Sequence, residues 1–381
     1  MTAPAPGSAC REAFALDPGF LTVNHGSFGA TPRAVLAAQD HWRARMEAQP
    51  TRFMSRVLPG ALRHAAARLA GFLGARADDI VFTENATTAV NAVLRSVPLR
   101  PMDEIVVLDH VYGAVGKAVD HVARTAGARV VRARLPFPDP TEAGVLAALA
   151  AALTGRTRLA VLDHITSASA LVLPVAAMVS LCHAHGVPVL VDGAHAPGQV
   201  PLDLTALGAD WYTGNCHKWL FAPKGAAFLW AASGRQAGLH PLAISHGYGQ
   251  GFLAEFDWTG TRDPSAALAV PDGIDFHAAL GGEALMARNA ALACEATELL
   301  AARFGAARGA GDGFMAAMGV VRLPVEASMA RAAALREALL DAGTDAPVHV
   351  LGDAVWLRLS AQAYNDSADY ERLAEVVKKV L

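Results

Sequence analysis

Apolar positions follow two alternating patterns along the first part of the chain. Residues 32–49 and 61–75 carry Ala-rich apolar positions at helical spacing, whereas residues 79–83 and 104–109 are short runs rich in β-branched residues. A further helix is expected at 87–97, between the two apolar runs. The order strand, helix, strand indicates a βαβ unit.

The alternation continues as far as residue 195. Further helices are predicted from about Gly113 and over 142–153 and 175–186, and further strands over 129–135, 158–166 and 187–195. Short apolar strands between such helices favour an α/β fold with a mainly parallel sheet that is covered on both faces. Ligands of such sheets bind beyond the carboxyl ends of the strands.

After about Pro271 the pattern changes to long Ala-rich helices, a Gly-rich break, the strand "AVWLRLS" (354–360) and a final helix. This change predicts a second, smaller domain of α+β type. The expected division is an N-terminal segment at 1–30 that packs with the small domain, a large domain at 31–270 and the small domain at 271–381.

Charge and composition exclude several classes of function. The 32 basic and 35 acidic residues give a net charge of −3, without a basic run that could follow a nucleic acid. Apolar residues make up 53%, yet no run approaches the roughly 20 uncharged residues of a membrane span. The start "MTAPAPGSACREAF" lacks the pattern of a secretory signal. We therefore expect a cytoplasmic protein without nucleic-acid or membrane partners.

Cysteine and histidine spacing gives no sign of a metal site. Four cysteines lie far apart without a CxxC pair, so neither a disulfide framework nor a zinc ribbon is indicated. In "LCHAHG", Cys182, His183 and His185 invite a metal interpretation, but residues two apart do not share a helix face. This group is expected to be a helix end.

Candidate chemistry begins with one lysine. Lys218 lies in "YTGNCHKWLFAPKG" (212–225), among aromatic, apolar and small residues. Such surroundings lower the pKa of a lysine, and enzymes use such lysines to form Schiff bases. The alternative is a lysine that extends its ammonium group to water from an apolar segment.

Two strand ends supply complementary groups. In "FTENATTAVN" a helix begins after a strand, and its amides together with Thr87 and Thr88 would suit a phosphate, although an ordinary N-cap is the alternative. Asp192 ends the strand in "VLVDGAHAPG"; it would pair with a protonated ring nitrogen or cap a helix. Pyridoxal phosphate needs phosphate-binding amides, an acid and a lysine, and the chain presents the three features in this order.

These motifs resemble the class V aminotransferase superfamily, in its isopenicillin N epimerase-like branch. The likeness runs from about Phe20 to the C-terminus and includes "VNHGSFGATP", "DHITSASALVLPV", "VDGAHAPGQVPLDLTALGADWYTGNCHKWLFAPKG", "ISHGY" and "DWTGTRDPSA". It implies a fold type I pyridoxal-phosphate enzyme with a seven-stranded sheet in its large domain. It also implies a homodimer whose active sites are shared between the subunits.

The resemblance assigns roles to individual residues. Lys218 would be the lysine of the internal aldimine, Asp192 the partner of the pyridine nitrogen, and Tyr112 the aromatic residue over the cofactor ring. The phosphate would be held by Ala86, Thr87, Asn215, His217 and, from the other subunit, Thr261. Ser167 and His195 would lie near the cofactor's 3-hydroxyl group. Arg358 would bind the substrate carboxylate, with Asn24 and His25 also at the substrate.

The implied activity is removal of the Cα proton from an amino-acid substrate by Lys218, followed by epimerisation. Alternatives are β-elimination by a C–S lyase acting on an S-substituted cysteine, transamination, or a pyridoxal-phosphate-binding regulatory dimer without catalysis. Desulfurases of the superfamily carry a nucleophilic cysteine before the arginine, and "DAPVHVLGDAVWLR" has none. Cys216 is instead expected to pack as a small residue. Arg52 and Arg56 would form an anion-binding edge, a solvated helix face or a dimer contact.

Overall fold

A seven-stranded sheet forms the centre of the large domain. The computed structural model describes residues 4–381. The strands are β1 (Ile80–Thr83), β2 (Glu104–Leu108), β3 (Arg129–Ala133), β4 (Thr157–Asp163), β5 (Val189–Asp192), β6 (Trp211–Asn215) and β7 (Ala227–Ala231), in the spatial order β1-β7-β6-β5-β4-β2-β3. β7 pairs antiparallel with both of its neighbours, and the pairs from β6 to β3 are parallel. The mainly parallel sheet predicted from the sequence is confirmed.

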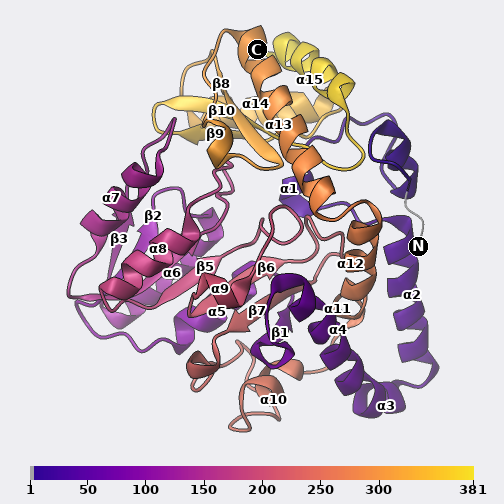
Figure 1. The fold of residues 1–381 in the computed structure, drawn as a ribbon, viewed down its shortest axis with the longest axis vertical. Helices are drawn as coiled ribbons and strands as arrows, with labels where there is room; N and C mark the ends of the chain where they lie inside the picture. Colours follow the sequence, from indigo (N-terminus) through magenta and orange to yellow (C-terminus); the bar gives the residue numbers. More distant parts are fainter. Residues whose placement is uncertain (1–3) are drawn as a thin grey trace.

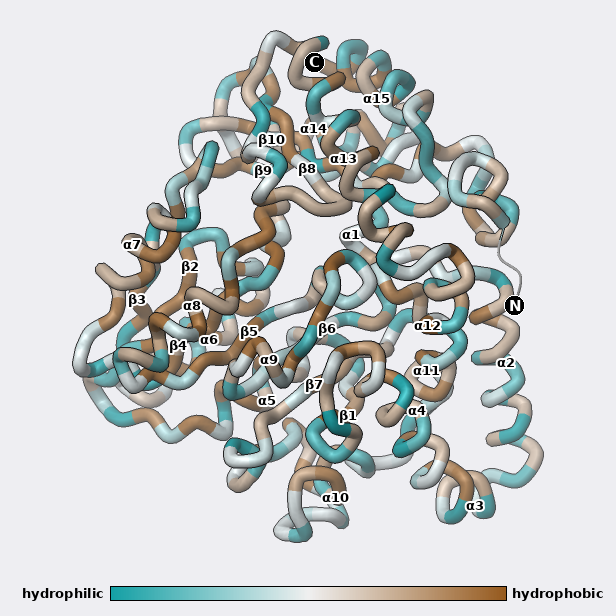
Figure 2. Tube along the Cα trace, in the orientation of Figure 1, coloured by the Kyte–Doolittle hydropathy of each residue, from teal (hydrophilic) through white to brown (hydrophobic). Residues whose placement is uncertain are grey.

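Helices cover both faces of this sheet (Figure 1). The main ones are α2 (Arg33–Ala48), α4 (Leu58–Leu73), α5 (Ala86–Ser96), α6 (Gly113–Ala126), α7 (Glu142–Ala152) and α8 (Val175–Ala184). Apolar side chains of α5 and α6 share one core with Val161 and Leu190, whereas those of α4, α7 and α8 share another core with Leu162 and Val191. Figure 2 shows apolar colour along the central strands and polar colour on outer turns such as those of α2.

Shorter elements connect these layers. They are η1 (Ser8–Ala13), α1 (His25–Phe28), α3 (Pro50–Arg52), the π-helical η2 (Phe53–Val57), η3 (Ala77–Asp79), α9 (Leu204–Leu207), η4 (Ser233–Arg235), α10 (Phe252–Asp257), α11 (Ser265–Leu268) and α12 (Val270–Ala279). α12 packs against α2 and α4 of the large domain. Over residues 4–381, none of the helices combines the length and the apolar character that crossing a bilayer requires.

The last part of the chain forms a smaller α+β domain, coloured orange to yellow in Figure 1. It contains α13 (Glu283–Phe304), η5 (Asp312–Phe314), β8 (Met318–Leu323), α14 (Met329–Asp341), β9 (Val348–Leu351), β10 (Ala354–Ser360) and α15 (Ser367–Val380). Its three strands form an antiparallel sheet in the order β8-β10-β9. α13, α14 and α15 bury their apolar sides against this sheet.

The N-terminal segment contacts the small domain. Leu21 donates its backbone N–H to Gly343 (2.8 Å), and Val23 accepts from Ser360 (2.7 Å). Both side chains are buried in the core of the small domain. The segment then enters α1, which lies between the two domains in Figure 1. Residues early in the chain are thereby held close to β10.

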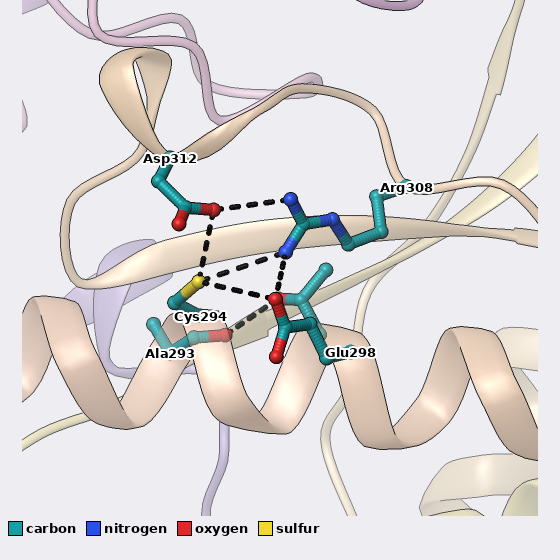
Figure 3. Close-up of polar contacts among 6 residues, drawn as sticks. Ala293, Cys294, Glu298, Arg308 and Asp312 are labelled. Atoms are coloured by element: carbon teal, nitrogen blue, oxygen red, sulfur yellow. Dashed lines mark hydrogen bonds and ion pairs between the residues drawn. The ribbon is translucent and has the colours of Figure 1, made fainter.

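A polar cluster fixes the start of the small domain, as Figure 3 shows. Arg308 donates to Glu298 (2.8 Å) and Asp312 (3.0 Å), and Cys294 Sγ donates to Asp312 (3.1 Å). Cys294, Glu298 and Asp312 are close enough together to bind a metal ion. However, the guanidinium group of Arg308 already bridges the two carboxylates. We interpret this cluster as an ion-pair network that ties α13 to η5.

Candidate active site

A pocket opens beyond the carboxyl ends of the parallel strands, where the fold class predicts a ligand. Its empty volume is about 1060 Å³, part of it open to solvent. The lining residues are Ser27, Phe28, Asn85, Ala86, Thr87, Thr88, Tyr112, Asp163, Ile165, Ser167, Asp192, Ala194, His195, Asn215, His217 and Lys218. They come from α1, from the strand ends of β4, β5 and β6, and from the first turns of α5 and α6. Nine of the residues predicted to form the cofactor site therefore line one pocket.

Lys218 lies on the segment that follows β6 and is only 9% exposed. Its Nζ lies 3.3 Å from Nε2 of His195. Burial and, secondly, the charge of Arg358 lower the pKa of Lys218 to about 8, against the opposing effect of Asp192. Far more of this amine is therefore uncharged near neutral pH than of an ordinary lysine, and the uncharged form is the one that attacks an aldehyde or accepts a proton.

The backbone around Lys218 is held by the N-terminal turn. His25 contacts the Lys218 carbonyl through Nε2 (2.9 Å) and Tyr364 through Nδ1 (3.0 Å). Gly29 has a φ of 70°, and a Cβ there would collide with the His217 carbonyl. Only a residue without a side chain permits this approach. The motif "VNHGSFGATP" thus positions the lysine segment. His25 does not line the pocket, and its contact with substrate stays a prediction.

Asp192 ends β5 and is buried, and its Oδ1 accepts from the Ala194 amide (3.0 Å). Burial raises the pKa of Asp192, against the Ala194 amide and the charge of Lys218. His195, three residues later, has a pKa well below its usual range because it is buried near Lys218 and Arg358. Its Nδ1 has no partner within residues 4–381. A neutral imidazole with a free nitrogen is therefore available to a bound group.

The first turn of α5 offers amides to the pocket. Asn85 caps the helix by accepting from the Thr88 amide (2.9 Å), and the Ala86 amide donates to Asn215 Oδ1 (2.9 Å). Thr87 lies between them and lines the pocket. His217 contacts the Ala226 carbonyl through Nδ1 (2.9 Å). This turn combines a helix N-terminus with hydroxyl groups, which is the chemistry of a phosphate site.

Arg358, on β10, contacts two residues that line this pocket, Ser27 and Ser167, from the small domain. Its side chain donates to the Ser167 carbonyl (2.6 Å), to Asn24 Oδ1 (2.8 Å) and to Ser27 Oγ (2.8 Å). All of these acceptors are neutral, and no carboxylate pairs with Arg358 in the described part of the chain. Burial lowers the pKa of Arg358 to about 10, so the group remains a cation at neutral pH. The charge of Asp345 acts on Arg358 without a direct ion pair, and a buried cation in such surroundings is suited to bind an anionic substrate group.

Several of the candidate residues do not line the pocket, among them the predicted substrate residues Asn24, His25 and Arg358. Thr261 is exposed in the loop after α10, and neither Arg52 nor Arg56 lines the pocket; both are exposed on α3 and η2. Cys216 is buried, and burial raises the pKa of its thiol above the ordinary value, so it is an inert packing residue in this structure. His183 pairs with Asp210 (2.9 Å), away from His185, at the end of α8.

Asp163 is a site residue that the sequence analysis missed. It ends β4 directly beside Asp192, is buried, and lines the pocket. The sequence carried the same signal for both residues, an apolar strand that ends in aspartate. Ser27 and Phe28 were also missed, because their approach depends on the packing of the N-terminal turn.

Comparison with known proteins decides the family. The model of the aminotransferase class-V family matches residues 29–373. The chain belongs to the class V aminotransferases. It is 38% identical to isopenicillin N epimerase of Amycolatopsis lactamdurans, over 97% of this chain and 97% of the relative. It is 36% identical to a putative L-cysteine desulfhydrase 1 of Oryza sativa, over 95% of this chain and 83% of the relative.

Solved structures confirm the fold of this class V aminotransferase. A mutant of C-DES, with glycine covalently linked to its PLP cofactor, superposes with a TM-score of 0.81 at 20% identity, over 96% of this chain and 98% of that chain. The chain is thus a fold type I, pyridoxal-phosphate-dependent enzyme of the isopenicillin N epimerase-like branch, in which relatives include both epimerases and C–S lyases.

The pocket fits pyridoxal phosphate by its own chemistry. The unpartnered His195 Nδ1, the buried Asp192 carboxyl and the first turn of α5, whose threonines Thr87 and Thr88 line the pocket, match the hydroxyl, ring nitrogen and phosphate of that cofactor. Lys218 supplies the amine for its aldehyde.

Proposed function

We propose that this enzyme removes the Cα proton of an amino acid and returns it on the opposite face, as an amino-acid epimerase. The observation that carries the proposal is a buried lysine with a pKa of about 8 in a pocket whose lining residues Ser27 and Ser167 hold a buried arginine, Arg358. Pyridoxal phosphate, when bound, supplies the electron sink that makes the Cα proton acidic.

Arg358 would orient the substrate. Its guanidinium group is held by Ser167, Asn24 and Ser27, so it does not have to be ordered when a substrate arrives. A planar guanidinium can bind a carboxylate through two parallel hydrogen bonds. This contact would fix the rotation of the substrate and place its Cα–H bond toward Lys218.

Lys218 would accept the proton. Its amine is shielded from bulk water, and its low pKa keeps a reactive neutral fraction available near neutral pH. His195 lies against Nζ and is itself uncharged, so it can exchange a hydrogen bond with either form of the amine. Asp192 would keep the cofactor ring nitrogen protonated, and Tyr112, half-exposed at the start of α6, would cover the ring.

Epimerisation is favoured among the possible fates by two relatives of matching length. The epimerases of Amycolatopsis lactamdurans and Streptomyces clavuligerus are 38% and 35% identical, and the chain covers 97% and 95% of their lengths. The second candidate is C–S β-elimination. It is supported by the 36% identity to the Oryza sativa relative named as a putative L-cysteine desulfhydrase.

A homodimer with shared sites is part of the proposal. Thr261 is exposed and lies outside the pocket of its own chain, which is expected of a residue that serves a neighbouring subunit. Leu242, Ile244 and Tyr248 form a set of exposed large apolar side chains in the preceding loop. Exposed apolar residues of this kind often belong to an interface between subunits.

Product analysis tests the reaction. The purified enzyme is incubated with candidate L-amino acids, including peptides with a free amino-acid end and S-substituted cysteines, and the products are separated on a chiral column with mass detection. A mixture of epimers without loss of mass supports epimerisation. Pyruvate with a released thiol would establish the lyase instead, and a keto acid with the aminated cofactor would establish transamination.

A further inference from the structure

Two buried carboxyl groups lie side by side at the carboxyl edge of the sheet. Asp163 and Asp192 are register partners on the parallel strands β4 and β5. Register partners point to the same face, and neighbouring strands are about 4.8 Å apart. The side chains are 2% and 4% exposed, and both line the pocket. Two carboxylates at this separation, without water around them, do not both ionise readily.

The groups around the pair come from four elements. On the same face are the backbone amide of Tyr112 at the start of α6, which acts on the Asp163 carboxyl, and Lys218, whose charge reaches Asp192. On the opposite face His164 pairs with Tyr212 (2.8 Å), so neither of these side chains neutralises Asp163. The charge of Lys218 therefore favours the ionised form of Asp192 and not that of Asp163.

The two aspartates have unequal surroundings. Asp192 Oδ1 accepts from the Ala194 amide (3.0 Å). In contrast, Asp163 Oδ2 is buried and has no hydrogen-bond donor among residues 4–381. Burial, followed by the charge of Asp192, raises the pKa of Asp163 well above its usual range. An unpartnered carboxyl oxygen beside a carboxylate is satisfied most simply if it carries the proton.

We propose that Asp163 is a neutral carboxylic acid that donates a hydrogen bond to the Asp192 carboxylate and thereby positions it. The inference rests on the proposed role of Asp192 at the cofactor ring nitrogen. A single proton shared by the two aspartates leaves one negative charge at this edge of the sheet. The hydrogen bond from Asp163 fixes the orientation of the Asp192 carboxylate. Asp163 acts through Asp192 and is a positioning residue.

Infrared difference spectroscopy of the apoenzyme tests which of the two aspartates carries the proton. We expect Asp163→Asn to lose a C=O stretching band of a protonated carboxyl group, and Asp192→Asn to lose a carboxylate band. If Asp163→Asn loses a carboxylate band instead, or if Asp192→Asn removes the protonated band, the proposal is overturned. The measurement uses no substrate, so it is independent of whether the enzyme is an epimerase.

Binding of pyridoxal phosphate to apoenzyme tests the hydrogen bond. Asp163→Asn keeps a neutral donor and should bind the cofactor within about threefold of wild type, whereas Asp163→Ala should bind about tenfold more weakly. Asp163→Leu serves as a second apolar variant if the alanine protein does not fold, as judged by circular dichroism. Equal weakening in the asparagine and apolar variants would contradict donation by Asp163. Failure of wild type itself to bind the cofactor would instead refute the assignment of the pocket.

Discussion

At the residue scale the site depends on cations that are kept out of water. Lys218 and Arg358 are both buried. Burial and the charge of Arg358 together lower the pKa of Lys218. The lysine gains reactivity from this arrangement, and the arginine remains charged without a direct ion pair in the described part of the chain. Their different chemistry predicts different consequences when each is changed.

Covalent labelling should identify the reactive lysine. Borohydride reduction of the enzyme with pyridoxal phosphate, followed by peptide mapping, is expected to place the cofactor on Lys218. Lys224 is the matched control, because it is only six residues away, is exposed, and donates to the Gly29 carbonyl (3.3 Å). Label on Lys224 in the wild-type protein, or unchanged labelling in Lys218→Ala, would exclude the assignment.

Burial of Lys218 should also be visible in the stability of the apoenzyme. Its pKa falls from 10.5 to about 8 on folding. Below pH 8 the lysine is charged in both states, and the charge costs more free energy in the folded protein than in the unfolded chain. Lys218→Met should therefore stabilise the apoenzyme at neutral pH by up to about 3 kcal/mol, and the gain should fade as pH rises from 8 to 10.5. Urea unfolding at several pH values measures it. A gain that does not change with pH would argue against a depressed pKa.

Arg358→Lys keeps the charge but loses the planar fork. We expect weaker substrate binding and turnover slower by about tenfold or more, with normal cofactor absorbance, because the cofactor contacts are unchanged. Steady-state kinetics and the absorption spectrum of the same preparation provide the two readouts. Wild-type KM and kcat in the variant would remove Arg358 from the substrate site.

The residues that form the site could largely be predicted where a polar motif follows an apolar strand. Asp192, Lys218 and the start of α5 come from such motifs. Asp163 shows the limit: an aspartate after an apolar strand was recognised on β5 and overlooked on β4, although the physical signal is the same. The partners of His25 could not be predicted, because they depend on how the N-terminal turn packs on residues far away in sequence.

At the element scale, helix starts and strand ends converge on one edge of the sheet. α5 and α6 pack on the same face and begin beside the ends of β4 and β5, so their first turns meet the aspartates. This convergence follows from the βαβ order, which the sequence pattern predicts. The sequence analysis did not assign β6, β7, β8 or β9 as elements. The antiparallel pairing of β7 depends on tertiary partners rather than on its own apolar pattern.

The N-cap of α5 offers a test of the phosphate site. Asn85→Ala removes the cap on Thr88, which should cost about 1 kcal/mol of stability and also loosen the turn that is expected to hold the phosphate. Ser328→Ala is the matched control, since Ser328 caps α14 of the small domain by accepting from Arg331 (3.0 Å). Both variants should lose similar stability by thermal unfolding, but only Asn85→Ala should release pyridoxal phosphate faster on dialysis. Equal release rates would argue against a phosphate site at this turn.

At the scale of the whole molecule, the pocket is lined by the large domain and the N-terminal turn, and the small domain contacts this lining. Lys218, Asp192 and the start of α5 line the pocket from the large domain, and Arg358 of the small domain donates to Ser27 of the N-terminal turn. The exposed position of Thr261 is consistent with a contribution from a second subunit.

Complementation tests the proposed shared sites. Lys218→Ala and a Thr261→Ala, Arg262→Ala double variant should each be inactive or strongly impaired alone. In a mixed dimer one of the two sites would be free of both changes, so activity should return to about half of wild type per heterodimer, as expected from two-fold symmetry. Analytical ultracentrifugation supplies the mass of the assembly. A monomer, or heterodimers without regained activity, would contradict the shared site.

Exchange of the Cα proton with solvent tests the central claim most directly. An accepted amino acid is incubated with the enzyme in deuterated water, and deuterium at Cα is measured by mass spectrometry and NMR in product and recovered substrate. Removal of the proton by Lys218 predicts deuterium at Cα in the wild-type reaction and its loss in Lys218→Ala. A product that keeps the original Cα proton, formed with release of carbon dioxide, would show that the enzyme breaks the bond to the carboxylate instead and would contradict the proposed reaction.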